Sequence, residues 1–168
     1  LKLKYDALEK ASYGTLYLDQ FSELSTEYMH KIIDSYTKGC QNLFKYDKSA
    51  KPRLIISFNQ ESYQSVLNTP SWNHLLNELN PLVIMMPPLR ERKEDIPILI
   101  DHFLDEIRRK SSEYENLTIS PQALHECFHY NWPGNIRQLK NALMQGAILS
   151  YGTTIESEHL PFSMNWRL

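Results

Sequence analysis

The sequence is short of cysteine and has no excess of positive charge, and each shortage excludes a class of protein. It has only 2 cysteines in 168 residues. Cys40 and Cys127 lie far apart, without the clustering that a disulfide framework or a zinc ribbon shows, so we expect two buried thiols in a reducing compartment. Lysine and arginine number 18 against 20 acidic residues. This balance argues against DNA binding by this chain alone, because nucleic-acid phosphates are held by an excess of cations.

Long hydrophobic runs are also lacking. No apolar run reaches the roughly 20 residues that a membrane span needs, and residues 1–4 do not resemble a signal peptide. We therefore expect a cytoplasmic protein with no membrane partner. The chain begins at Leu1 instead of a methionine, which suggests a piece of a longer protein. With 42% apolar residues, it can still bury a sizeable core.

The first half of the chain carries the pattern of an α/β protein. Apolar runs at 15–19, 54–58 and 82–86 are typical of buried parallel strands, and the last run ends at a pair of prolines. Between the first two runs, a Ser-Thr-Glu cap at 25–27 opens a helical pattern that we expect Gly39 to end. Strands that alternate with helices favour a parallel sheet over an antiparallel sandwich.

The second half changes character after Pro88, because helical patterns follow and strand patterns do not. Apolar residues recur at helical spacing over about 93–111, 121–130 and 136–150. Ser120 precedes a proline at the first position of the second helix, a common way to open a helix. We therefore expect a domain boundary at Pro88, with an all-α unit after it.

Three segments together resemble one known family. The run A-S-Y-G-T-L-Y-L-D-Q at 11–20 is similar to the Walker B segment of the AAA+ domain of sigma-54-dependent transcriptional activators, the bacterial enhancer-binding proteins. The run P-P-L-R-E-R-K-E-D-I-P at 87–97 is similar to that family's entry into the helical lid, and Y-N-W-P-G-N-I-R-Q-L-K-N at 130–141 is similar to its sensor II segment. The resemblance covers nearly the whole chain.

The resemblance implies an α/β fold class in two parts. Residues 1–88 would be the C-terminal half of the nucleotide-binding core, a partial parallel sheet from the Walker B strand onward. Residues 89–168 would be the all-α lid subdomain that carries sensor II. In the family, the Walker A phosphate loop and the sigma-contacting loop precede this part of the domain, and a DNA-binding helix-turn-helix follows the lid.

The Walker B match assigns two catalytic positions. Asp19 would hold Mg²⁺ through its water shell, since that cation prefers carboxylate oxygen; the other interpretation is an aspartate that only caps the next turn. Gln20 stands where the family has a glutamate that activates water. An amide cannot accept the proton, and loss of a general base costs roughly 10²–10⁴-fold in rate. The alternative is that Gln20 still orients water by hydrogen bonding.

Two further positions would contact nucleotide phosphate. Asn59 resembles the sensor I residue, although Phe58 replaces the threonine that precedes it in the family; Asn59 could instead cap a helix beginning at Glu61. Arg137 matches the sensor II arginine, whose planar group of donors suits phosphate. The alternative for Arg137 is a surface arginine paired with an acid.

The lid hinge and the subunit interface complete the implied site. Arg90 and Arg92 lie at the hinge, where we expect them to form ion pairs that position the lid; the alternative is that they contact the nucleotide directly. The family's two arginine fingers, which reach a neighbouring subunit's nucleotide, are replaced by Trp72 and Glu78. Because such a finger is worth roughly 10³–10⁵-fold in rate, these two replacements are the strongest argument against ordinary ATPase activity.

These residues predict a nucleotide-sensing and oligomerisation module of a bacterial transcriptional regulator, with degenerate ATPase machinery. The resemblance implies ATP and Mg²⁺ as cofactors of the full-length protein and none in this fragment. Self-association into a ring or dimer is expected, whereas the sigma factor and DNA would be contacted only through regions outside this chain. One alternative is an active ATP-hydrolysing activator. A more remote one is a zinc hydrolase, because His125 and His129 fit the motif H-E-x-x-H.

Overall fold

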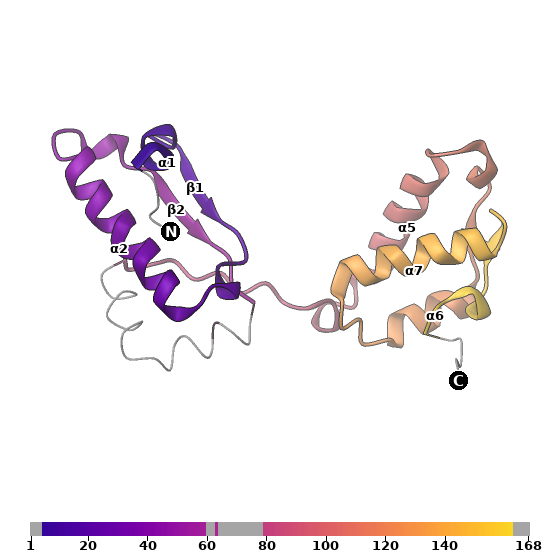
Figure 1. The fold of residues 1–168 in the computed structure, drawn as a ribbon. Helices are drawn as coiled ribbons and strands as arrows, with labels where there is room; N and C mark the ends of the chain where they lie inside the picture. Colours follow the sequence, from indigo (N-terminus) through magenta and orange to yellow (C-terminus); the bar gives the residue numbers. More distant parts are fainter. Residues whose placement is uncertain (1–4, 60–62, 64–78, 163–168) are drawn as a thin grey trace. The chain divides into compact units, whose positions relative to one another are not determined.

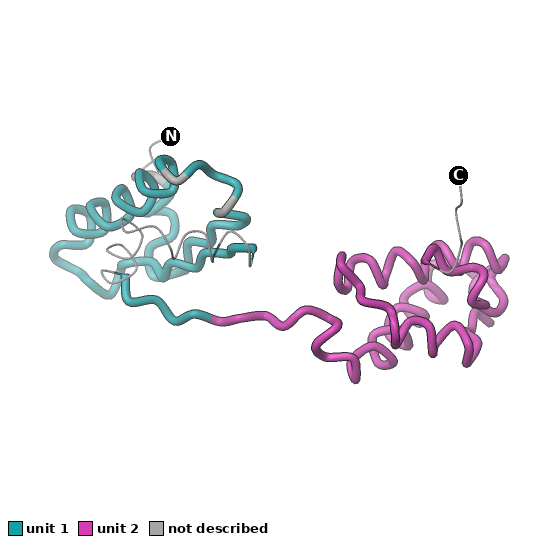
Figure 2. Tube along the Cα trace, turned by 90° about the horizontal axis from the view of Figure 1, so that it is seen from below, with its two compact units in different colours: residues 1–83 teal, residues 84–168 magenta. Residues whose placement is uncertain are grey.

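The computed structural model describes residues 5–59, 63 and 79–162. The chain divides into two compact units, residues 1–83 and 84–168 (Figure 2). The sequence-based boundary lies a few residues further along, at Pro88.

Unit 1 is a two-stranded parallel sheet packed against helices (Figure 1). Among the residues that the structure describes, its helices and strands include α1 (Tyr5–Lys10), β1 (Thr15–Leu18), α2 (Thr26–Leu43) and β2 (Arg53–Ile56), with short 3₁₀ turns at Phe21–Glu23 and Lys48–Ala50. The strands pair in register, with Leu16 opposite Leu54 and Leu18 opposite Ile56. The first two predicted strands and their parallel arrangement are therefore confirmed.

Helix α2 provides the buried face of unit 1. Its apolar side chains pack against one side of the sheet, and the two clusters that result have these buried members: Phe21, Met29, Ile32 and Ile33; and Leu8, Tyr36, Cys40, Phe44 and Ala50. The prediction that Gly39 ends this helix is wrong, because α2 continues to Leu43. A mid-helix glycine costs about 1 kcal/mol, and burial of Cys40 beyond it offsets that cost.

Within the described residues, the sheet is covered on one side only. Burial alternates along both strands, so Leu16 and Leu54 are half-buried, whereas Tyr17 and its partner Ile55 are 56% and 45% exposed. The apolar runs predicted strands that are buried on both faces, and that expectation is wrong in this chain. The reason is that α2 packs on one face and nothing in the described part of the chain packs on the other.

The third predicted strand, at 82–86, is not a strand. Residues 82–86 form no helix or ladder, and every one of their side chains is exposed, from 48% at Val83 to 88% at Leu82. A strand needs a neighbour that accepts its backbone hydrogen bonds. The sheet of unit 1 holds only β1 and β2 among the described residues, so this run has no pairing partner there.

Unit 2 is a helical bundle with one short parallel pair. It contains α5 (Asp95–Arg108), β3 (Thr118–Ile119), α6 (Pro121–His129), α7 (Asn135–Leu149) and β4 (Thr154–Ile155), with 3₁₀ turns at Leu89–Glu91, Ser112–Tyr114 and Ser157–His159. The three predicted helices are confirmed. No strand was predicted after Pro88, and the two-residue strands β3 and β4, which pair in parallel, were missed because so short a pairing leaves no periodic signal in the sequence.

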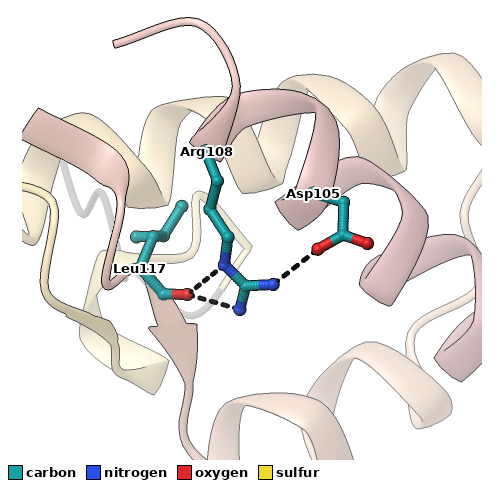
Figure 3. A network of polar contacts seen from close by, with 3 residues as sticks. All are labelled: Asp105, Arg108 and Leu117. Atoms are coloured by element: carbon teal, nitrogen blue, oxygen red, sulfur yellow. Dashed lines mark hydrogen bonds and ion pairs between the residues drawn. The ribbon is translucent and has the colours of Figure 1, made fainter. Parts of the chain in front are cut away.

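Local signals explain how unit 2 forms its helices. The Ser120 hydroxyl accepts a hydrogen bond from the Ala123 amide (3.3 Å), which is the predicted cap of α6. At the C-terminal end of α5, the Arg108 side chain forms three hydrogen bonds (Figure 3). It donates from Nε and Nη2 to the Leu117 carbonyl oxygen (2.9 and 2.6 Å) and from Nη1 to Asp105 Oδ1 (2.7 Å). This arginine ties the end of α5 to the segment that enters β3.

The core of unit 2 lies between α5, α6 and α7. Its fully buried side chains include Ile96, Ile100, Leu139 and Leu143, together with the indole of Trp132. Both cysteines are buried free thiols, as predicted. Among the described residues, no helix combines the length and apolar character that crossing a membrane requires.

Candidate functional site

The parallel strands β1 and β2 lie side by side (Figure 1). Their carboxyl ends bring Asp19 together with Ser57. The Ser57 hydroxyl donates to Asp19 Oδ1 (2.7 Å), and the Tyr17 hydroxyl donates to the same oxygen (2.8 Å). The backbone amide of Gln20 also donates to this oxygen (3.0 Å). All three donors therefore hold one carboxylate oxygen, and Asp19 Oδ2 accepts no hydrogen bond from the described residues.

These donors keep the carboxylate charged. The Ser57 hydroxyl lowers the pKa of Asp19, with smaller contributions from the Tyr17 hydroxyl and the Gln20 amide, and desolvation opposes them. Asp19 itself is exposed. A charged, oriented and accessible carboxylate can hold a hydrated divalent cation. The Gln20 contact also fits the simpler interpretation, in which Asp19 caps the turn after β1.

Gln20 begins the turn after β1 in a conformation that few residues adopt. Its φ of 49° and ψ of 40° lie in the left-handed region. The backbone amide of Gln20 also donates to the Ser57 hydroxyl (2.8 Å), and the backbone amide of Phe21 donates to the Ser57 carbonyl oxygen (3.0 Å). These bonds lock the backbone of the turn to the end of β2. Gln20 is exposed, so a side-chain amide is accessible at the position where the resemblance implies a glutamate in the family.

Asn59 follows β2 and is exposed. The backbone carbonyl oxygen of Asn59 accepts from the Tyr63 amide (3.0 Å). A hydrogen bond between residues four apart in sequence occurs at the start of a helix. This bond agrees with the interpretation of Asn59 as a cap and leaves its role as sensor I a prediction. The preceding Phe58 packs edge-on against Phe21, with 5.9 Å between the ring centroids. Trp72 and Glu78, which the resemblance places at the finger positions, lie outside the described residues, so their role stays a prediction.

Arg137 lies in the first turn of α7, in unit 2. Its side chain is exposed, and no acid in the described part of the chain forms an ion pair with it. The alternative of an arginine paired with an acid therefore has no support there. Arg137 lines a hollow of about 300 Å³ together with Gln138, Asn141 and Gln145. Three residues that carry amide groups therefore share this hollow with Arg137.

The turn before α7 positions Arg137. Trp132 is fully buried, and its indole N–H donates to the Cys127 carbonyl oxygen (2.7 Å). Trp132 and Asn135 both have positive φ, 47° and 50°, and the Asn135 amide donates to the Trp132 carbonyl oxygen (2.8 Å). The Asn135 side chain accepts from the Leu89 amide (2.8 Å). The start of α7 is therefore bonded to the entry of unit 2.

Arg90 and Arg92 each form an ion pair with an acid that is close in sequence. Arg90 lies 3.9 Å from Glu91 and Arg92 lies 3.7 Å from Asp95, measured between charged atoms. Such exposed, long pairs contribute about 0–1 kcal/mol. Their role in positioning the lid stays a prediction.

The two histidines of the H-E-x-x-H motif lie side by side on α6. The rings of His125 and His129 are 4.2 Å apart between centroids, and His129 Nδ1 hydrogen-bonds the His125 carbonyl oxygen (2.9 Å). No group of three histidine, cysteine or acidic side chains suited to a metal exists among the residues that the structure describes. The zinc hydrolase alternative gains no support from this arrangement.

Sequence reasoning missed the residues that orient the candidate site. Ser57 and Tyr17 position Asp19, and Asn135 positions the start of α7. A signal for Ser57 was present, because pairing two parallel strands in register places the residue after β2 opposite the residue after β1. No comparable signal identified Asn135, whose partner is 46 residues away in sequence.

A partial parallel sheet with an acid at its carboxyl edge, followed by a helical bundle with an arginine at the start of its last long helix, is the architecture of an AAA+ ATPase domain. Residues 90–167 match the family described as the AAA+ ATPase lid domain. The solved structure of NtrX from Brucella abortus in complex with ATP superimposes with a TM-score of 0.73 at 27% identity, covering 95% of this chain and 38% of NtrX.

Curated relatives are transcriptional regulators. The transcriptional regulatory protein XylR of Pseudomonas putida is 38% identical over 146 residues, which are 84% of this chain and 25% of XylR. The Nif-specific regulatory protein of Herbaspirillum seropedicae is 31% identical over 159 residues, 94% of this chain and 29% of that protein. The chain belongs to the AAA+ family of the sigma-54-dependent transcriptional activators. It spans about a quarter to a third of the length of these relatives.

Proposed function

We propose that the chain is the second half of a nucleotide-sensing AAA+ module, which binds ATP and self-associates but hydrolyses ATP poorly. It would regulate transcription through domains attached to it in the full-length protein. The observation that carries this proposal is the catalytic edge, where an oriented carboxylate, Asp19, is followed by an amide, Gln20, and not by a second carboxylate.

Nucleotide binding is supported by the way Asp19 is held. Its three hydrogen bonds all go to Oδ1, so Oδ2 is available for a water of hydrated Mg²⁺. The lowered pKa of Asp19 keeps this carboxylate negative at neutral pH, which a cation requires. Mg²⁺ would supply neutralisation of the phosphate charge.

Phosphate sensing is supported by Arg137. Buried packing of the turn at Trp132 and the bond from Asn135 to the Leu89 amide fix the start of α7, yet the guanidinium two residues later has no acidic partner in the described chain. A cation that is held at its base and unneutralised at its tip suits an anionic ligand. The ATP complex of NtrX shows that a protein with this fold binds that nucleotide.

Poor hydrolysis follows from Gln20 and the finger positions. Loss of the base costs roughly 10²–10⁴-fold, and loss of a finger costs roughly 10³–10⁵-fold. Trp72 and Glu78 carry no positive charge. Such a module can report nucleotide occupancy without consuming the nucleotide.

The test measures ATP binding and turnover separately in the full-length protein that carries this chain. We expect the protein to bind ATP. We expect its turnover to stay below the rates of about 1 s⁻¹ or more that are usual for enzymes. Arg137→Gln should weaken binding about tenfold or more, because a hydrogen bond to a charged group is worth about 1.5–3 kcal/mol. The control Arg109→Gln removes the same charge from an exposed position at the end of α5.

Restoring the missing groups tests the cause of inactivity. Gln20→Glu combined with Trp72→Arg and Glu78→Arg should raise turnover by at least about 10²-fold, whereas Gln41→Glu, on the exposed surface of α2, should not. Turnover of about 1 s⁻¹ by the unmodified protein, or no ATP binding at all, would contradict the proposal.

A further inference from the structure

A second candidate site lies in unit 1, at the amino ends of β1 and β2. A hollow of about 590 Å³ opens there, and its charged lining residues are Lys48, Lys51 and Arg53. Gly14 and Thr15, at the start of β1, form its other side. No acid lines it. Asp19 follows the opposite, carboxyl end of β1, so the hollow is separate from the candidate nucleotide site.

The cations of this hollow are not neutralised. None of Lys48, Lys51 and Arg53 forms an ion pair with an acid in the part of the chain that the structure describes. On α2, by contrast, Lys31 pairs with Glu27 and Lys38 with Asp34. The segment 45–53 has four cations and one acid, in a chain whose net charge is -2.

The one acid of this segment is already occupied. Asp47 accepts from the Tyr13 hydroxyl (2.7 Å) at one oxygen and from the Ser49 amide (3.0 Å) and hydroxyl at the other. These bonds lower the pKa of Asp47, the Ser49 hydroxyl contributing most. Asp47 therefore serves to cap the turn at Lys48–Ala50, and both of its oxygens have partners.

The backbone that presents the cations is held in place. The Arg53 amide donates to the Gly14 carbonyl oxygen (2.9 Å), and the Tyr13 amide donates to the Ala50 carbonyl oxygen (3.0 Å). The buried Tyr36 hydroxyl donates to the Pro52 carbonyl oxygen (2.9 Å). The Lys51 ammonium lies 5.3 Å from the centre of the Tyr36 ring. An anion that binds here would thus meet partly preorganised donors, which lowers the entropic cost of binding.

We propose that this hollow binds the phosphate backbone of single-stranded nucleic acid. Several cations along one short segment suit a chain of repeated phosphates. An exposed tyrosine, Tyr13, lines the hollow with these cations and is 73% exposed. Tyr46 precedes Lys48 by two residues in the same segment and is 95% exposed, and the Lys45 ammonium lies 5.5 Å from the centre of its ring. Aromatic rings next to cations favour nucleic acid over an acidic peptide, because bases stack on such rings while phosphates contact the cations. The near-neutral charge of the whole chain concealed this local excess.

The test uses the full-length protein and a fluorescently labelled oligothymidylate, with polyglutamate as the acidic-polypeptide probe. Binding is measured by fluorescence anisotropy over a range of salt concentrations. Each phosphate contact with a single strand contributes about 0.7 to the slope of log K against log salt. Lys48→Gln/Lys51→Gln should therefore reduce the slope by about 1.4 and weaken binding at low salt, and Lys48→Arg/Lys51→Arg should restore both.

The matched control is Lys31→Gln/Lys38→Gln, which removes two lysines of unit 1 that are already paired with acids. It should leave the slope unchanged. Tyr46→Ala should weaken oligothymidylate binding about fivefold or more through lost stacking. Circular dichroism establishes that each variant is folded. Equal slopes for the two glutamine pairs, or binding of polyglutamate without oligothymidylate, would overturn the proposal.

Discussion

The hydrogen bond between Asn135 and Leu89 allows a sharp test of how the lid is held. The Asn135 side-chain oxygen accepts from the Leu89 amide (2.8 Å), and Leu89 is fully buried. A buried donor without an acceptor costs about 1–3 kcal/mol. Asn135 also has a φ of 50°, a conformation that costs an ordinary residue about 1–2 kcal/mol but costs asparagine or glycine much less.

Three substitutions separate these two contributions to the free energy of unfolding of unit 2. Asn135→Asp keeps an acceptor oxygen and a tolerance of positive φ, and should cost less than about 1 kcal/mol. Asn135→Gly loses only the acceptor, and should cost about 1–3 kcal/mol. Asn135→Ala loses both, and should cost about 2–5 kcal/mol.

The assay is urea unfolding followed by tryptophan fluorescence. Trp132 is fully buried in unit 2, so a Trp72→Phe/Trp166→Phe background makes the signal specific for that unit. If the aspartate and glycine variants unfold at the same urea concentration, the hydrogen bond contributes nothing. If the alanine and glycine variants unfold together, the positive φ carries no cost.

Two other substitutions probe the packing of unit 2. Gly146→Ala should destabilise it by about 1–3 kcal/mol in thermal unfolding, because the added Cβ would lie 2.8 Å from Cγ2 of the fully buried Ile155; an unchanged melting temperature would show that β4 can shift. Burial raises the pKa of Cys127 to about 12. In a Cys40→Ser background, a thiol reagent at neutral pH should therefore label Cys127 only as fast as unit 2 opens. Immediate labelling without denaturant would contradict this expectation.

The sequence predicted best where a local pattern and the packing agree. Helix α6 has a serine cap, a proline at its first position and a periodic apolar face, and it begins and ends within a residue or so of the prediction. Helix α2 ran past Gly39 because its buried face continues to Phe44. Propensity is a weak influence compared with burial, so a single glycine did not mark the end.

Prediction failed where a structure depends on a partner far away in sequence. The run at 82–86 has the composition of a strand but no neighbour in the described chain with which to pair. The Asn135 bond joins two segments that no local pattern connects. The basic hollow escaped notice for a related reason, since net charge sums over the chain and Tyr13 joins Lys48 only through folding.

The residues of the candidate site differ in what the fold requires of them. Replacing Asp19 would leave the Ser57 and Tyr17 hydroxyls without their acceptor, so its presence has a structural explanation besides the proposed catalytic one. Arg137 has no such explanation: it is exposed, and the described chain gives it no acid to pair with. An unneutralised cation contributes little to folding, so the proposed contact with nucleotide phosphate is the role that Arg137→Gln tests. Nucleotide affinity in Arg137→Gln is therefore a more informative measurement of the proposed function than any variant of Asp19, whose effects would mix binding with the integrity of the turn.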